Sequence, residues 1–591
     1  MNEFQPYYRI FTENEKRKKD PNQMIHYHIS YSNPLTHLVE IEISIDAIST
    51  PFVELQIPAW RPGRYELQNY AANIKQFKAV DDKDQNLSFA KTSRNRWKVN
   101  TGKSKEVKIR YQYYACQMDA GGCWLDEEQL YLNFICCAMY VPERINEVCT
   151  VQLSLPENYK IACGLPKNGH FLTAENFYHL VDSPMIASAG MTHAEFDCQN
   201  IPFHIWIQGK NHLSLEKLIS DFKKYTEIQI AMMGDFPEKE YHYLFQFLPY
   251  RHYHGVEHRN STVITLGPAE TLPEKGYDDL LGISSHELFH AWNIIKIRPV
   301  EMLPYDFTKE NYFTTGFVAE GFTTYYGDLF LVRSGVISKE EYFKELNSSF
   351  KKHFDNFGNH NLSLSESSQD LWVDGYIVGI PNRKVSIYVK GCIVALLLDL
   401  EIRKHTDHQK SLDDLMRLLW NDFGKKGKGY SLQEIIEASS KIAGVDLQEF
   451  FEECVFGHTD LKLLLENALK MVGCSLKEKP SEHITEKNYG FSLIPKQNKF
   501  FVDSIAPESP AEKVLSKDDE IMMINGQPVS DNLNELFSTQ ETPVLEVNRW
   551  GRKLLVAIEI TKEGNYFPQY SIVLDENTGI KEKENFEKWL G

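Results

Sequence analysis

The chain has 591 residues, 42% of them hydrophobic and 25% charged, and a net charge of −18. That length exceeds what one hydrophobic core supports, so several domains are expected. The acidic balance argues against a nucleic-acid or anionic-membrane partner and favours a cytoplasmic protein. No apolar run is long enough for a transmembrane helix. No signal peptide is visible at the N-terminus, and a chain trimmed of its leader would look the same.

The first part of the chain is predicted to be an all-β, sandwich-like domain over residues 1–200. Apolar and polar residues alternate with period two in several segments that turn-forming residues separate, namely 25–31, 38–45, 106–114 and 149–155. The segment 58–65 is a turn in which two prolines and a glycine frame Trp60. Taken alone, it predicts a rigid corner at the surface. The ten cysteines show no Cys-x-x-Cys spacing, which favours buried free thiols over a zinc ribbon or a disulfide framework.

The rest of the chain predicts an α+β domain over 201–475 and a β-rich unit with a C-terminal tail over 476–591. The expected order is a strand at 203–207, a helix at 215–222, a strand at 241–248, a loop at 251–259, a strand at 261–266 and helices from 276 to 471. The charged stretch 477–487 predicts a linker.

One motif carries chemistry that its spacing largely dictates. His286 and His290 lie four residues apart, so a helix over 284–293 would place both imidazoles on one face, able to bind one zinc ion. Glu287 between them could act as general base toward a water molecule. The opposite face of this helix is apolar, with Leu281, Leu288, Trp292 and Ile295.

A zinc enzyme of this kind needs a third protein ligand. Glu320 is the best candidate, because it lies thirty residues after His290 in a largely uncharged helical segment flanked by aromatic residues. Burying such an acid is unfavourable unless a positive group meets it. A second helix packed against the first would bring it to the site.

These motifs together resemble a known family. The sequence Glu320-Gly-Phe-Thr-Thr-Tyr-Tyr326 after the His-Glu-x-x-His helix is similar to the gluzincin metallopeptidases, and in particular to peptidase family M61, the glycyl aminopeptidases. The resemblance covers nearly the whole chain. The turn at 58–65 resembles the N-terminal signature of that family, 255–258 resembles its Gly-x-Glu-His element, and 386–391 resembles its Tyr-x-Lys-Gly element.

The resemblance implies a thermolysin-like catalytic domain in which His286, His290 and Glu320 bind Zn²⁺. It also implies that Glu287 is the general base, that Tyr388 donates a hydrogen bond to the oxyanion and that Glu257 holds the α-ammonium group of the substrate. The implied substrates are peptides with a free N-terminus, preferably with glycine or alanine first.

The C-terminal unit resembles a PDZ domain, with 488–491 similar to the carboxylate-binding loop and 509–526 similar to the later helix, turn and strand. Asp518-Asp519 stands where a Gly-Asp pair is usual. Such a domain would bind a C-terminal peptide, or would merely pack on the catalytic domain. Two alternative functions stay open at this point. One is a zinc endopeptidase of the same fold, and the other is a non-catalytic PDZ interaction protein with a vestigial peptidase domain.

Overall fold

The computed structural model describes residues 24–377, 379–529, 533–538 and 542–591. The chain divides into two compact units. The first comprises Met1–Arg61, Gln68–Thr192 and Trp206–Gly209, and the second comprises Pro62–Leu67, His193–Ile205 and Lys210–Gly591. Residues 1–23, in which the sequence shows no signal peptide, lie outside the described residues. Among the residues with described positions, no helix is both long and apolar enough to cross a membrane.

The first unit is built of β-sheets, as predicted. Its seven-stranded sheet has the order β12-β13-β10-β1-β2-β7-β4, and sheets of four strands (β11-β14-β9-β8) and three strands (β3-β6-β5) accompany it. The four predicted strands are present as β1 (Met24–Ser30), β2 (Leu38–Ile45), β7 (Val107–Tyr114) and β10 (Val148–Leu153). The other elements are β3 (Phe52–Gln56), β4 (Ile74–Asp81), β5 (Phe89–Ser93), β6 (Arg96–Asn100), β8 (Trp124–Leu125), β9 (Gln129–Leu132), α1 (Phe134–Cys137), β11 (Lys160–Cys163), β12 (Lys167–Asn168), β13 (Phe171–Ala174), α2 (Phe177–Val181) and β14 (Met185–Ser188).

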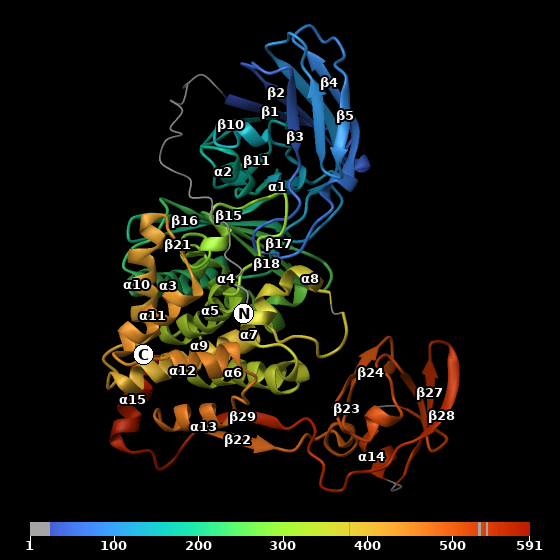
Figure 1. Ribbon diagram of the computed structural model, residues 1–591, viewed down its shortest axis with the longest axis vertical. Helices are drawn as coiled ribbons and strands as arrows, with labels where there is room; N and C mark the ends of the chain where they lie inside the picture. Colours follow the sequence, from blue (N-terminus) through green and yellow to red (C-terminus); the bar gives the residue numbers. More distant parts are fainter. Residues whose placement is uncertain (1–23, 378, 530–532, 539–541) are drawn as a thin grey trace, which may run out of the picture. The chain divides into compact units, whose positions relative to one another are not determined.

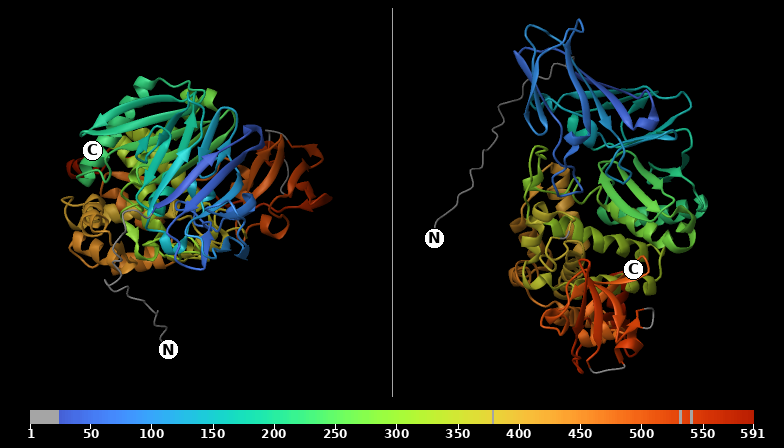
Figure 2. Two further views of the ribbon diagram at one scale, coloured as in Figure 1. Left: turned by 90° about the horizontal axis from the view of Figure 1, so that it is seen from above. Right: turned by 90° about the vertical axis from the view of Figure 1, so that its right-hand side faces the viewer.

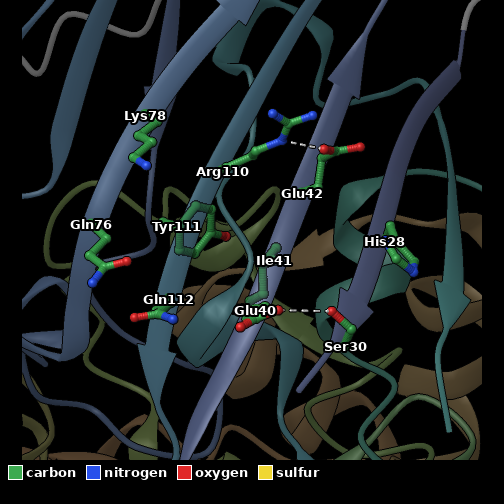
Figure 3. A pocket seen from close by; sticks show the side chains of 10 residues that line it. All are labelled: His28, Ser30, Glu40, Ile41, Glu42, Gln76, Lys78, Arg110, Tyr111 and Gln112. Atoms are coloured by element: carbon green, nitrogen blue, oxygen red, sulfur yellow. Dashed lines mark hydrogen bonds and ion pairs between the residues drawn. The ribbon is translucent and has the colours of Figure 1, made fainter. Parts of the chain in front are cut away.

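A pocket of about 330 Å³ lies on the face of the seven-stranded sheet, over β1, β2, β4 and β7 (Figure 3). Two pairs of its polar groups bond to each other. Arg110 Nε donates to Glu42 Oε2 at 2.5 Å, and the Ser30 hydroxyl donates to Glu40 Oε2 at 3.4 Å. None of its lining residues is a predicted catalytic or zinc-binding residue.

The second unit opens with a five-stranded sheet of order β15-β16-β17-β19-β18. Its strands are β15 (Thr192–Cys198), β16 (Ile201–Gly209), β17 (Tyr241–Phe247), β18 (His252–His258) and β19 (Ser261–Gly267). The prediction of a loop at 251–259 was wrong. This segment is strand β18, which pairs antiparallel with β19 from His252↔Gly267 to His258↔Ser261. Its histidines and glutamate concealed the apolar alternation by which a strand is usually recognised.

Helices then dominate, as predicted, and Figures 1 and 2 show them in green to orange. Helix α4 (Tyr277–Phe289) packs on β18, β19 and α5 (Phe322–Arg333), and α5 packs on α9 (Val389–His405). The remaining elements are α3 (Leu215–Met233), β20 (Arg298–Pro299), α6 (Lys339–Phe354), α7 (Leu364–Gln369), α8 (Leu371–Asp374), α10 (Leu412–Asp422), β21 (Gly429–Tyr430), α11 (Leu432–Ala443), α12 (Gln448–Phe451) and α13 (Lys462–Lys470).

The C-terminal part forms a small β-domain with the strand order β23-β24-β25-β27-β28, in which β26 pairs with β25. Its buried core includes Phe491, Val502, Phe537 and Val547. The bounds are β22 (Cys474–Lys479), β23 (Phe491–Lys496), β24 (Lys499–Ile505), β25 (Glu520–Ile524), β26 (Gln527–Pro528), α14 (Leu533–Ser538), β27 (Val544–Arg549), β28 (Arg552–Ala557), β29 (Gln569–Leu574) and α15 (Ile580–Leu590).

Two details of this part bear on the sequence predictions. The predicted linker at 477–487 is wrong in its first residues, because β22 pairs antiparallel with β29 from Cys474↔Leu574 to Lys479↔Gln569. Charged residues are compatible with an exposed two-stranded ribbon, so composition alone misled the prediction. Asp518, at the position where glycine is usual, has a φ of 67°, so it adopts the left-handed conformation that glycine would supply.

All ten cysteines are free thiols, as predicted, and all except Cys116 are buried.

Candidate active site

The two motif histidines lie at the C-terminal end of α4. The helix ends at Phe289, earlier than predicted, yet the His290 N–H still donates to the His286 carbonyl at 3.3 Å. The two rings therefore share one face, with centroids 4.6 Å apart and Nε2 atoms 3.0 Å apart. Leu281, Leu288, Trp292 and Ile295 are all buried, as the apolar face of the motif predicted.

Glu320 comes from a short π-helical segment, Phe317–Gly321, that leads into α5. Glycines explain how closely this segment approaches α9. A Cβ added at Gly321 would lie 2.4 Å from the Gly391 Cα atom, so the two backbones are in direct contact. Glycine at both positions thus lets the helices cross where Glu320 and Tyr388, the residue directly before α9, face the site.

The three predicted ligands converge. Glu320 Oε2 lies 3.3 Å from His290 Nε2 and 3.8 Å from His286 Nε2. Ligand atoms that surround one zinc ion tetrahedrally at about 2.0–2.2 Å are about 3.3–3.5 Å apart. Two imidazoles and one carboxylate at this spacing fit a zinc ion and leave a fourth position for water or substrate.

Two further residues orient these ligands. His290 Nδ1 lies 2.9 Å from the Asn293 carbonyl oxygen, which can only accept, so the ring proton is at Nδ1 and Nε2 is free to bind a metal. The Asn293 side chain donates to the Val318 carbonyl at 2.7 Å, which ties the end of α4 to the segment that carries Glu320. The Tyr65 hydroxyl donates to Glu320 Oε1 at 3.0 Å and thereby fixes the carboxylate.

The electrostatics of the site favour a cation. Burial would lower the pKa of His290, but Glu320, Glu257 and Glu287 outweigh it and raise the pKa to about 10. Burial would raise the pKa of Glu320, but His290 and His286 lower it to about 2. Burial lowers the pKa of His286, against the opposing effect of Glu320. The carboxylates thus create a strongly negative field at the point where the ligands meet.

Two more predicted residues lie beside the ligands. Glu257, Glu287 and His290 each offer a ligand atom, and these atoms lie within 4.8 Å of one another. Both glutamates are buried. Glycines make room for them, because a Cβ at Gly255 would lie 2.3 Å from Glu287 Oε1, and one at Gly63 would lie 2.5 Å from Glu257 Oε2.

Tyr388 completes the set of predicted residues. Burial, Glu320 and Tyr376 raise its pKa well above the ordinary value for tyrosine. Its hydroxyl lies 3.3 Å from that of Tyr376. Tyr388 therefore keeps its proton at neutral pH and can donate a hydrogen bond.

Three family models match this chain. The sequence matches the Peptidase M61 N-terminal domain over residues 26–189, the M61 glycyl aminopeptidase domain over 279–394 and a PDZ domain over 465–541. The chain has the domain composition of an M61-family peptidase with a PDZ domain. No curated protein matches it.

A solved structure shares the fold of this chain. A crystal structure of an aminopeptidase N family protein from Idiomarina loihiensis is 24% identical, with a TM-score of 0.89 over 96% of this chain and 100% of the other. An M1 zinc metallopeptidase from Deinococcus radiodurans, in a mutant form bound to a Tyr-Ser-Ala substrate, is 12% identical, with a TM-score of 0.48 over 74% of this chain and 94% of the other.

Sequence reasoning missed part of the candidate site. The turn at 58–65 is no surface corner, since Trp60 and Tyr65 are buried and Tyr65 bonds to Glu320. Its resemblance to the family signature was the available signal, because a rigid turn with an aromatic residue at its end is suited to hold a side chain in place. Asn293 was also missed, and only its position three residues after His290 could have pointed to it.

Proposed function

We propose that this protein is a zinc-dependent aminopeptidase that hydrolyses the first peptide bond of peptides, preferring glycine or alanine at the N-terminus. One observation carries the aminopeptidase assignment. Glu257 is a buried carboxylate within 4.8 Å of His290 and Glu287, in addition to the three residues that suffice to bind zinc. A fixed carboxylate beside the metal is suited to pair with a free α-ammonium group. The preference for small residues rests on the family resemblance.

The proposed roles follow from the chemistry of each group. Zinc held by His286, His290 and Glu320 would polarise the scissile carbonyl and lower the pKa of a water molecule toward neutrality. Glu287 takes the proton from the attacking water and delivers it to the leaving amine. Protonated Tyr388 donates a hydrogen bond to the oxyanion. Glu257 holds the substrate N-terminus and thereby restricts cleavage to the first bond.

The proposal also covers the function of the C-terminal domain and the cellular location of the protein. Among the described strands, β23 is at the edge of its sheet, next to β24, so an extended C-terminal peptide can add to it as a further strand. We place the protein in the cytoplasm and divide its chain near residues 200 and 475 into N-terminal, catalytic and PDZ-like domains. A PDZ-like domain that only packs on the rest of the chain would show no peptide binding in a fluorescence titration.

The test combines metal analysis with hydrolysis of glycyl-, alanyl- and leucyl-p-nitroanilide, with and without a chelator. We expect one zinc per chain at the catalytic site and chelator-sensitive release from the glycyl or alanyl substrate. Glu287→Gln should keep the zinc and lose turnover. Glu257→Gln should keep the zinc and lose about 2–5 kcal/mol of transition-state binding with free-amine substrates, which is typical for truncating one partner of a buried charge pair.

Other outcomes would select the alternatives. If an N-acetylated peptide is cleaved as fast as the free peptide, and Glu257→Gln has no effect, the protein is an endopeptidase. If zinc is absent after purification without chelators and cannot be restored, the peptidase domain is vestigial and the protein is an interaction protein.

A further inference from the structure

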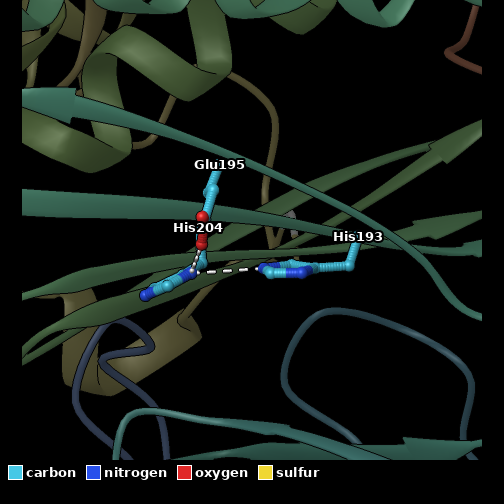
Figure 4. A group of neighbouring side chains, drawn as sticks. All are labelled: His193, Glu195 and His204. Atoms are coloured by element: carbon cyan, nitrogen blue, oxygen red, sulfur yellow. Dashed lines mark hydrogen bonds and ion pairs between the residues drawn. The ribbon is translucent and has the colours of Figure 1, made fainter.

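A second set of metal-ligand side chains lies on the five-stranded sheet. His193 and Glu195 come from the edge strand β15, and His204 comes from β16 (Figure 4). None of these residues is a predicted site residue, and none has a role in the proposed hydrolysis. We propose that they form a second metal site, for a divalent transition-metal cation such as Zn²⁺.

The local fold brings these side chains to one face. Gln199 and Asn200, the two residues between the strands, have φ values of 52° and 63°, which is typical of a tight two-residue hairpin turn. Such a turn pairs Cys198 with Ile201. Counting three residues back along one strand and three forward along the other then places Glu195 opposite His204. Because side chains alternate across a strand, His193 shares the face of Glu195.

The spacing of the donor atoms matches a metal site. His193 Nε2 lies 3.2 Å from His204 Nδ1, and Glu195 Oε2 lies 3.5 Å from the same nitrogen. These distances are close to the edges of about 3.3–3.5 Å expected for a tetrahedral zinc site. They also resemble the catalytic set, in which His290 Nε2 is 3.0 Å from His286 Nε2 and 3.3 Å from Glu320 Oε2.

The surroundings of His204 favour metal binding at its Nδ1 atom. Its other ring nitrogen, Nε2, faces Glu240 Oε2 at 3.9 Å. His242 stacks on the His204 ring, with centroids 4.7 Å apart and an interplanar angle of 20°. The distance from Nε2 to Glu240 is that of an ion-pair contact, too long for a hydrogen bond, and the negative charge there favours a cation bound to the ring.

The exposure of the ligands indicates what kind of site this is. His193 and Glu195 are exposed, whereas His204 is mostly covered, with 17% of its side chain accessible. Three protein ligands at the surface leave a position open to water, so the ion would exchange with solvent. Two imidazoles and a carboxylate suit Zn²⁺, Cu²⁺ or Ni²⁺ better than Mg²⁺ or Ca²⁺.

The experiment must separate this site from the catalytic one. The full chain carrying His286→Ala and His290→Ala is dialysed against buffered Zn²⁺, and its metal content is measured by mass spectrometry. We expect it to retain one zinc per chain. Adding His193→Ala should weaken that binding by at least about 100-fold, because even outer-shell partners of a metal are worth about 10–100-fold in affinity. His212→Ala, an exposed histidine outside this group, is the matched control and should have no effect.

Wild-type protein provides an independent comparison if the double variant does not fold. Its titration should show two zinc ions per chain. The variants His193→Ala and Glu195→Gln should each bind only the catalytic zinc. The proposal is overturned if no zinc beyond the catalytic one binds, or if His193→Ala leaves the second zinc in place. In the first case, the 3.2 Å contact is a hydrogen bond between two imidazoles. Failure of the catalytic proposal would look different, because the wild-type chain and the double variant would then bind equal amounts of zinc.

Discussion

Replacing Tyr65 with phenylalanine tests how Glu320, a proposed zinc ligand, is held. The variant removes one hydroxyl, which donates to Glu320 Oε1 at 3.0 Å, and keeps the ring that packs on Phe313 at a centroid distance of 5.1 Å. A hydrogen bond to a charged group contributes about 1.5–3 kcal/mol. We therefore expect zinc affinity to fall about 10–100-fold, as is typical when an outer-shell partner of a metal ligand is lost.

The assay is a competition between the protein and a chelator for zinc at fixed pH, followed by kcat at saturating zinc. Because Tyr65 has no direct part in the reaction, kcat should change little once the metal is bound. Tyr342→Phe is the matched control, since this buried hydroxyl, in helix α6, has no hydrogen-bond partner among the described residues. If Tyr65→Phe binds zinc as tightly as wild type and Tyr342→Phe do, the hydroxyl does not hold Glu320 in place.

Three further predictions follow from single side chains. Tyr388→Phe should lower kcat about 10²–10³-fold and leave the zinc content unchanged, because one oxyanion donor is lost. Gly321→Ala should lower stability by about 1–3 kcal/mol in thermal unfolding, since its Cβ would meet the Gly391 backbone, whereas Gly379→Ala, with nothing within 4 Å, should not. Burial and Glu345 raise the pKa of Asp328 from 3.8 to about 7. The stability of the wild-type protein should therefore decrease as the pH rises from about 3.8 to about 7. The gain in Tm from Asp328→Asn should accordingly be larger at pH 8 than at pH 5, and an equal gain at both would contradict the shift.

The proposed zinc ligands could be predicted from the sequence because two of them are close together in the chain and the third has unusual neighbours. Helical spacing alone places His286 and His290 on one face, and Glu320 was distinguished by its uncharged, aromatic surroundings. The structure shows these three side chains within 3.0–3.8 Å of one another. The strands of the first unit could also be predicted from the sequence, since period-two alternation is a local property of the chain.

What could not be predicted depends on contacts between distant segments. Tyr65 is 255 residues from Glu320, and nothing in its own turn shows that its hydroxyl meets a carboxylate. The strand at His252–His258 was missed for a related reason. Two of its polar side chains, Glu257 and His258, are buried, and a pattern that expects apolar residues inside does not recognise buried polar ones.

The charges of the site favour an aminopeptidase over an endopeptidase. Glu257, Glu287 and Glu320 are 4%, 5% and 2% exposed, and His286 and His290 would be neutral as zinc ligands. Three carboxylates buried around one point create a negative field that favours a divalent cation and a positively charged group of the substrate beside it. The α-ammonium group of a free peptide is such a group, and a carboxylate pairs with it by charge-assisted hydrogen bonds. A blocked peptide brings no such charge, so we expect a free-amine substrate to be hydrolysed faster than its N-acetylated form.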